Sequence, residues 1–248
     1  MVRLAVPLLS TCGLCGLLVA VLANGISDTA NCGADHGSSR VLFDNERLRI
    51  IDYRLAPGAQ ANLTNTVPTV RWQIKGADEE IPMPTFHAAG TCTAMSHAAG
   101  EAIERRFFVF EVKGPPKYGE ERVRELLRAP NYTSAVGSRM FLENDLVRMW
   151  DFHSPVGMDE FHQHVLDYAF VVIGNHSALN LFHPNASLPN GTQYDATFGF
   201  IDGHVSWEAV GNGGFEPDGK LPIMPGCLHS VDTRGISHEF REYLIELK

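Results

Sequence analysis

The stretch from Gly157 to Gly174 reads Gly-Met-Asp-Glu-Phe-His-Gln-His-Val-Leu-Asp-Tyr-Ala-Phe-Val-Val-Ile-Gly. It places two histidines, His162 and His164, just before an aromatic and β-branched run that is typical of a β-strand. Side chains on a strand alternate between its two faces, so we expect both imidazoles on the same side. Two imidazoles on one face provide half of a metal site.

A turn further along the chain supplies a third histidine. Met-Pro-Gly-Cys-Leu-His, from Met224 to His229, is a Pro-Gly turn followed by the strand-like segment 239–247. Together the two motifs resemble the pair of signature motifs of the cupin superfamily. The resemblance rests on the following positions: Gly157, His162, His164, Gly174, Pro225, Gly226 and His229.

This resemblance implies an all-β chain of tandem double-stranded β-helix (jelly-roll) barrels, which suits the many Gly and Pro turns. It also implies that His162, His164 and His229 hold one divalent transition metal. Three neutral imidazoles can bind iron, manganese, zinc, nickel or copper, and the sequence does not choose among these metals.

The glutamate of the family motif has no counterpart in this chain. Its place is taken by Tyr168, which follows Asp167. On a regular strand Tyr168 faces inward and Asp167 outward, whereas a bulge would exchange them. An inward Tyr168 is a candidate catalytic residue, as a hydrogen-bond donor, weak ligand or general acid or base, and the alternative is an aromatic side chain in the barrel wall.

An internal repeat indicates two copies of one β unit. Residues 43–53 align without gaps on residues 142–152, and residues 106–113 match residues 241–248. We therefore expect a signal peptide at 1–25, a degenerate N-terminal barrel at 26–113, a linker with a short helix at 114–139 and a metal-binding C-terminal barrel at 140–248.

The first copy lacks the imidazoles of the second. Gapless alignment places four residues opposite His162, His164, Tyr168 and His229, namely Leu63, Asn65, Thr69 and Ala94. We expect this copy to be structural, and the alternative is that it keeps a relic small-molecule pocket.

The apolar start of the chain and its glycosylation motifs predict export. Residues 1–25 are typical of a secretory signal peptide, and a signal anchor is the alternative. The sequence predicts five N-glycosylation sites: Asn62, Asn131, Asn175, Asn185 and Asn190. A Cys32–Cys92 disulfide would fit an oxidising compartment and would leave Cys227 free.

Two further patterns predict local structure. Asp202-Gly203, between apolar alternating segments, predicts a hairpin, and residues 183–197 predict a polar loop that could cover a barrel mouth.

The net charge of −9 argues against nucleic-acid or anionic-membrane partners, since binding to either needs a basic surface. The resemblance implies a secreted metal-dependent enzyme, dioxygenase-like or lyase- or isomerase-like, acting on a small, anionic organic substrate. The alternative is a non-enzymatic germin-like or auxin-binding-like extracellular glycoprotein that binds a small molecule. No membrane span is expected after signal cleavage, and a homodimer is the default expectation from the family.

Overall fold

The computed structural model describes residues 37–74, 81–97, 103–128, 132–154, 157, 160–185, 187–210, 228–234 and 240–248. The first half consists of strands, with these bounds: β1 (Ser38–Asp44), β2 (Leu48–Leu55), β3 (Gln60–Asn65), β4 (Thr69–Ile74), β5 (Thr85–His87), β6 (Thr91–Ser96) and β7 (Arg105–Val112). One helix follows, α1 (Glu120–Arg128). The described part of the second half has nine strands: β8 (Arg139–Glu143), β9 (Val147–Ser154), β10 (His162–Gln163), β11 (Asp167–Val172), β12 (His176–Pro184), β13 (Thr192–Phe200), β14 (Val205–Glu208), β15 (Leu228–Asp232) and β16 (Phe240–Leu247).

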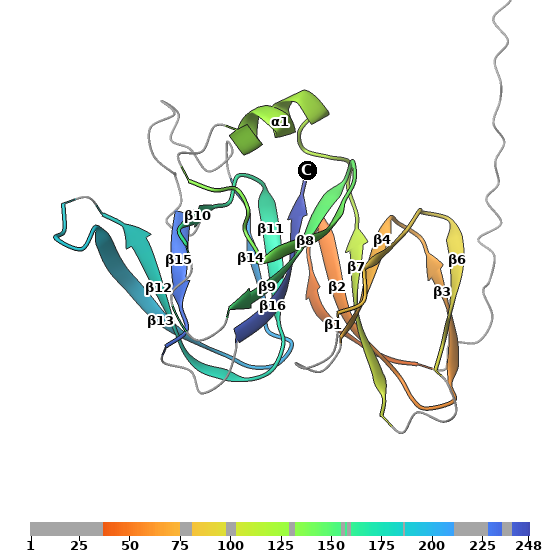
Figure 1. Cartoon of the computed structure of the whole chain (residues 1–248). Helices are drawn as coiled ribbons and strands as arrows, with labels where there is room; N and C mark the ends of the chain where they lie inside the picture. Colours follow the sequence, from red (N-terminus) through yellow and green to blue (C-terminus); the bar gives the residue numbers. More distant parts are fainter. Residues whose placement is uncertain are drawn as a thin grey trace, which may run out of the picture.

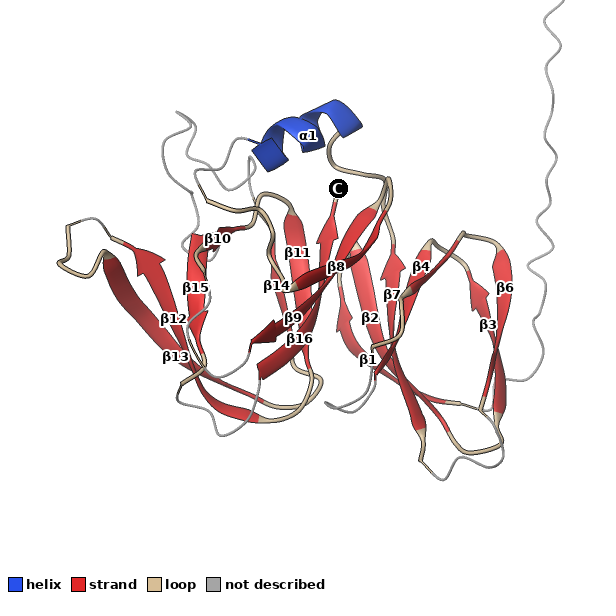
Figure 2. Cartoon of the chain, viewed as in Figure 1, coloured by secondary structure: helices blue, strands red, loops and turns tan. Residues whose placement is uncertain are grey.

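Each half combines a five-stranded sheet with a smaller sheet. The large sheets run β1-β2-β7-β4-β5 and β8-β9-β16-β11-β14, and the small ones are β3-β6 and β10-β15-β12-β13. Figures 1 and 2 show the two halves side by side, with their large sheets in the middle of the molecule and their small sheets outside. The all-β fold expected from the sequence is therefore confirmed.

The two halves repeat each other at the level of single contacts. Asp52 pairs with Arg106 at 2.8 Å, and the matching residues Asp151 and Arg241 pair at 2.9 Å. Asn45 and Asn144, which also match, each accept a hydrogen bond from the amide three residues on. The strands of the first half end at Val112 and those of the second begin at Arg139, while the domain limits themselves stay a prediction.

An apolar core joins the two large sheets. Residues of one face of each sheet form this cluster, including Ile50, Val70 and Phe108 from the first half and Met149, Val171 and Ile245 from the second. The rings of Trp72 and Tyr243 stack across it with centroids 3.8 Å apart. Side chains at alternate positions of the same strands therefore point away from this core and into each barrel.

Ion pairs at the edge of this core link the halves further. Arg106 bridges Asp52 of its own half and Asp202 of the second, at 2.8 and 2.7 Å. Asp167 is contacted by Arg47 of the first half and by Lys117, the latter at 3.0 Å.

Helix α1 lies over one end of the second barrel (Figure 1). Its buried residues Val123 and Leu126 pack on Val165 and Leu166, which follow the histidine pair. The helix thereby covers the segment that carries His164. No helix in the described part of the chain has the length and apolar character needed to cross a membrane.

Three local expectations from the sequence are wrong. The strand expected to hold both histidines, β10, ends at Gln163, because the chain then crosses to the large sheet, where β11 begins at Asp167. Residues 183–197 form the end of a β12–β13 hairpin rather than a loop, since the two strands pair as far as Pro184 and Thr192. The Asp202-Gly203 turn joins β13 to β14, which lie in different sheets, so it turns a corner between layers.

Candidate metal centre

Three imidazoles come together at one end of the second barrel. His162 on β10 pairs directly with His229 on β15, so their side chains lie on the same face. The ring centroids are 4.6 Å apart for His162 and His229, and His164 lies 5.2 Å from each of them. The fold therefore brings together the three histidines that the sequence motifs predicted to share a site.

The surroundings of the triad hold its rings in place. His162 Nδ1 donates to the carbonyl oxygen of Glu160 at 3.3 Å, which fixes the tautomer in which Nε2 carries the lone pair that can bind a metal. His164 is buried and stacks on Tyr168, with ring centroids 3.7 Å apart. Burial, together with the neighbouring His162 and His229, holds the pKa of His164 well below its usual value. Its ring is neutral near pH 7, the form that binds metals.

The donor set fits a divalent transition metal. The ligand atoms of the three histidines all lie within 4.8 Å of one another, and two ligands of a tetrahedral ion with bonds of about 2.1 Å are about 3.4 Å apart. His164 Nδ1 is buried and has no hydrogen-bond partner within the described part of the chain. These are the only described residues that form a cluster of at least three His, Cys, Asp or Glu able to hold a metal.

Tyr168 faces the barrel interior and Asp167 faces out. Tyr168 lines the pocket beside His164, whereas Asp167 is turned toward Arg47 and Lys117 on the opposite side of the strand. The strand is regular at this point, because Asp167, Tyr168 and Ala169 pair in unbroken register with β16. The bulge that would have exchanged the two side chains is absent from β11.

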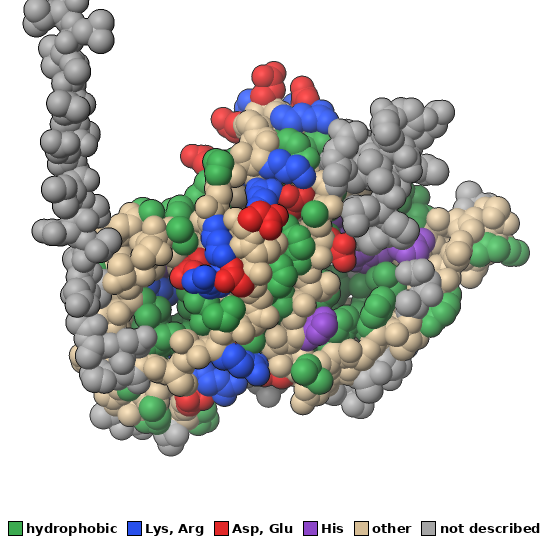
Figure 3. All heavy atoms as spheres, turned by 180° about the vertical axis from the view of Figure 1, so that it is seen from behind, with side chains coloured by type: hydrophobic (Ala, Val, Ile, Leu, Met, Phe, Trp, Pro, Cys, Tyr) green, Lys and Arg blue, Asp and Glu red, His purple; other side chains and the backbone are tan. Residues whose placement is uncertain are grey.

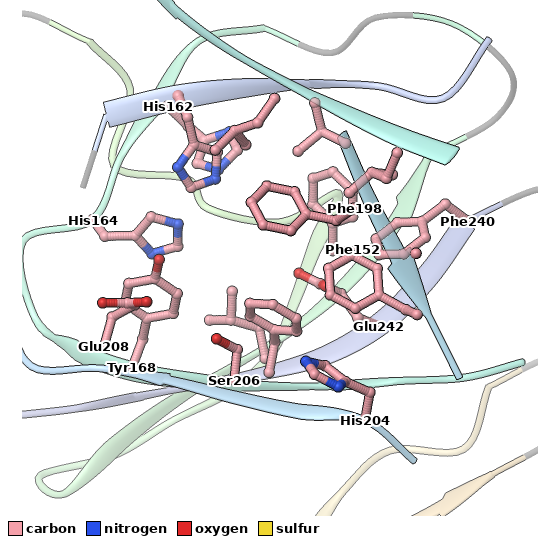
Figure 4. A pocket seen from close by; sticks show the side chains of 18 residues that line it. Phe152, His162, His164, Tyr168, Phe198, His204, Ser206, Glu208, Phe240 and Glu242 are labelled. Carbon is pink, nitrogen blue, oxygen red and sulfur yellow. The ribbon is translucent and has the colours of Figure 1, made fainter. Parts of the chain in front are cut away.

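A pocket of about 360 Å³ leads away from the histidines through the barrel. Its wall is largely aromatic, with phenylalanines from several strands: Phe152, Phe170, Phe198, Phe200 and Phe240. Figure 4 shows Tyr168 and Glu208 beside His164 at one end, and Phe152, Phe198 and Phe240 toward the other. From behind, histidine side chains are visible among hydrophobic ones in a hollow of the surface (Figure 3).

Sequence reasoning missed two acidic residues of this pocket. Glu208 on β14 pairs directly with Tyr168, and burial raises the pKa of its carboxyl group. Glu242 on β16 lines the pocket further along. The signal for Glu208 was present, since His204, Ser206 and Glu208 alternate with the apolar Val205 and Trp207. From the sequence alone this alternation predicts a hairpin around Asp202-Gly203 and does not identify the wall of a site.

No family model and no curated protein matches this chain. Solved structures do match it. AerE from Microcystis aeruginosa covers 87% of this chain and 94% of its own at 8% identity, with a TM-score of 0.53. An oxalate decarboxylase variant from Bacillus subtilis covers 89% and 75% at 13% identity (TM-score 0.49), and a cupin domain from Bordetella pertussis Tohama I covers 44% and 90% at 20% identity (TM-score 0.31). The chain has a jelly-roll fold that is similar to that of AerE over most of both chains.

The N-terminal barrel has Leu63, Asn65 and Thr93 where the C-terminal barrel has its three histidines. Asn65, which aligns with His164, donates to Thr91 and Thr93 at 2.7–3.1 Å. Leu63 pairs with Thr93 as His162 pairs with His229, so the match to His229 is Thr93 rather than the expected Ala94. Loop lengths differ between the copies, and gapless alignment from the C-terminus therefore shifts the register by one residue.

The predicted glycosylation sites on described residues differ in their exposure to solvent. Asn175 and Asn190 are exposed, and Asn62 and Asn185 are half-buried. Asn131, Cys32 and Cys227 lie outside the described residues. Cys92 is disulfide-bonded, and its pairing with Cys32 stays a prediction.

Proposed function

We propose that the C-terminal cupin barrel is a metal-dependent enzyme site. The observation that carries the proposal is the position of the three histidines at one end of a pocket of about 360 Å³, next to a half-buried carboxyl group and a tyrosine. His162, His164 and His229 would hold one divalent transition metal, which supplies Lewis-acid or redox chemistry when bound.

The residues around the histidines are suited to moving a proton. Burial raises the pKa of Glu208, so its carboxyl group can take up or release a proton closer to neutral pH than an exposed glutamate. Tyr168 lies beside it on the neighbouring strand and stacks on His164, which places its ring between the carboxylate and the metal ligands. We assign proton transfer to Glu208 and substrate positioning to Tyr168.

The pocket wall favours a neutral substrate with an apolar body over the anion expected from the sequence. Its apolar surface comes mostly from phenylalanine and leucine side chains, which bind aromatic or aliphatic groups. No lysine or arginine of the described chain lines it, whereas Glu208 and Glu242 do. A substrate with a negative charge along the pocket would therefore be repelled by these two acidic side chains. A substrate with a polar group at the end near the histidines would bind better.

Metal analysis combined with an activity screen tests this proposal. We expect near-stoichiometric transition metal in the purified wild type and in His87→Ala, which removes a half-buried imidazole from the other barrel. The double variant His162→Ala/His164→Ala should lose the metal. Screening neutral aromatic and aliphatic compounds should then give turnover that requires the metal. Retained metal in the double variant would refute the site, whereas bound metal without turnover would favour a binding protein.

We also propose that the protein is secreted and glycosylated. The apolar segment within residues 1–25, the excess of glycosylation motifs and the disulfide at Cys92 support this proposal. A mass decrease on treatment with an N-glycosidase, after expression in a eukaryotic secretory host, would test it. An unchanged mass would count against glycosylation.

A further inference from the structure

One wall of the pocket in the second barrel carries a row of three polar side chains. Ser206 and Glu208 lie on β14, His204 directly precedes this strand, and all three line the pocket. Figure 4 shows them in a row along the wall, with Glu208 beside His164 and His204 farthest from it. The pocket therefore has a polar side chain at each end of this wall.

The backbone and a neighbouring ring hold His204 in this position. Its amide donates to the carbonyl oxygen of Ile201 at 2.9 Å, and its own carbonyl oxygen accepts from the amide of Val172 at 2.9 Å. The His204 ring packs against Phe200, with ring centroids 4.9 Å apart. The pairing of β14 with β11 thus continues through His204, so its side chain stays on the pocket face of the strand.

The polar atoms of this wall are available to a ligand. The His204 ring and the Ser206 hydroxyl have no hydrogen-bond partner among the described residues, and both side chains are half-buried. An imidazole and a hydroxyl can each donate and accept a hydrogen bond. A molecule that fills the pocket displaces water from these groups, and a polar group that is left unpaired in this way lowers the affinity.

The dimensions and charge of the pocket define the molecule that it fits. A strand rises about 3.3 Å per residue, so His204 and Glu208 are about 13 Å apart along it. The pocket wall is otherwise largely aromatic. The carboxylate of Glu242 lines the same pocket and disfavours a negatively charged group. The pocket therefore fits an elongated aromatic molecule that carries a neutral polar group at each end.

We propose that His204 is a specificity-determining residue that binds a neutral hydrogen-bonding group at the end of the substrate remote from the three metal-ligand histidines. The substrate class is an elongated aromatic molecule with a hydroxyl or carbonyl group at each end, one toward His204 and one toward Glu208. This inference rests on the proposed function of the pocket as a substrate site, and it requires neither the metal nor turnover. It adds a second polar group to the apolar body inferred from the pocket wall.

Two biphenyl compounds that differ by one hydroxyl group test the proposal. The compound p,p′-biphenol carries a hydroxyl group at both ends, whereas p-phenylphenol carries only one. Their dissociation constants are measured by isothermal titration calorimetry on the full chain as purified, under nitrogen so that no oxygen-dependent reaction consumes them. We expect the wild type to bind p,p′-biphenol about threefold to tenfold more tightly, after correction for its two equivalent orientations, as for one net hydrogen bond.

Substitution of the histidine localises this preference. His204→Phe keeps a ring of similar shape without the hydrogen bond, so it should bind the two compounds equally after the same correction. Its affinity for p-phenylphenol shows whether the pocket is intact. His204→Gln supplies a donor and an acceptor again and should restore the preference in part. His87→Phe, the same substitution in the other barrel, should keep the full preference.

Equal affinities in the wild type, or no binding of either compound, would overturn the proposal, and this comparison needs no variant to fold. A full preference in His204→Phe would overturn the assignment to His204. Equal behaviour of His204→Gln and His204→Phe would show that the shape of the side chain, rather than a hydrogen bond, sets the preference. Failure of the metal site would instead appear as a lack of metal in the purified protein with the binding preference unchanged, so the two failures are distinguishable.

Discussion

Glu208 and Tyr168 are direct neighbours on adjacent strands, and both face the pocket beside His164. A family glutamate would come from the same strand as the tyrosine, whereas here the carboxylate comes from β14. The site therefore has an acidic group although Tyr168 stands where the family motif has glutamate. Glu208 on β14 thus stands in for the motif glutamate, and its role can be tested by replacing it.

Replacing Glu208 with glutamine keeps the shape of the side chain and removes its ability to exchange a proton. We expect Glu208→Gln to bind metal as the wild type does and to lose turnover of the screened substrate by about 10²- to 10⁴-fold, the usual range for a general acid or base. Metal content and steady-state rates measure the two effects. Glu143→Gln, at an exposed position, should change neither. Full activity in Glu208→Gln would remove this residue from the mechanism.

The depressed pKa of His164 predicts how acid affects the metal-free protein. The unfolded imidazole takes up a proton near pH 6.5, whereas folded His164 does so only at a lower pH. Stability is therefore full above about pH 6.5 and falls by about 1.4 kcal/mol per pH unit below it, until the folded group also titrates.

Urea unfolding of chelator-treated protein between pH 7.5 and 5 measures this effect. His164→Phe should lose the corresponding part of the pH dependence. His204→Phe, which removes an imidazole elsewhere in the pocket, should retain it. An identical pH dependence in wild type and His164→Phe would show that His164 is not held neutral by the fold.

At the scale of elements, short turns decide which sheet a strand joins. The Asp202-Gly203 turn sends the chain from the small sheet to the large one, and Gly203 has φ of 77° there. Asp202 accepts a hydrogen bond from the Gly174 amide at 2.9 Å, which ties two corners of the barrel together. β14, and with it Glu208, is therefore positioned by this corner.

Substitution of Gly203 should weaken the corner. The left-handed conformation costs residues with a side chain about 1–2 kcal/mol, and a Cβ at Gly203 would also lie 3.3 Å from Arg40 Nη2. We expect Gly203→Ala to lower the free energy of unfolding by that amount in urea denaturation. Gly114→Ala, where a Cβ would meet nothing within 4 Å, is the matched control. Equal effects of the two variants would contradict this account.

Motifs and the repeat could be predicted from the sequence because they depend on spacing along the chain. His162, His164 and His229 were found in this way, and the duplication is visible in the matching ion pairs of the two halves. Glu208 could not be assigned, since its place beside Tyr168 depends on which strands pair. The β12–β13 hairpin was missed because its prolines and asparagines gather at the tip, which made the whole segment look like a loop.

For the whole molecule, the central feature is one apolar core shared by both large sheets. Trp72 from the first half and Tyr243 from the second stack in it, and neither is exposed to solvent. Unfolding of one half would expose the core face of the other. We therefore expect the two halves to unfold together.

Truncation of the stacked tryptophan should destabilise the whole chain. Trp72→Ala should cost about 3–5 kcal/mol, as for other large aromatic residues removed from a core. It should also lower the stability of the second half, followed by hydrogen exchange of its strands. Tyr194→Ala, at a mostly exposed position of β13, should cost less than about 1 kcal/mol. Loss of protection confined to the first half would show that the halves are independent.

The most direct test of the metal site is a titration of metal-free protein with Co²⁺, followed by its visible absorption. We predict one equivalent bound per chain in the wild type and in His87→Ala, and none at this site in the double variant His162→Ala/His164→Ala. Equal binding by wild type and double variant, or no binding by either, would contradict the assignment of the three histidines as metal ligands.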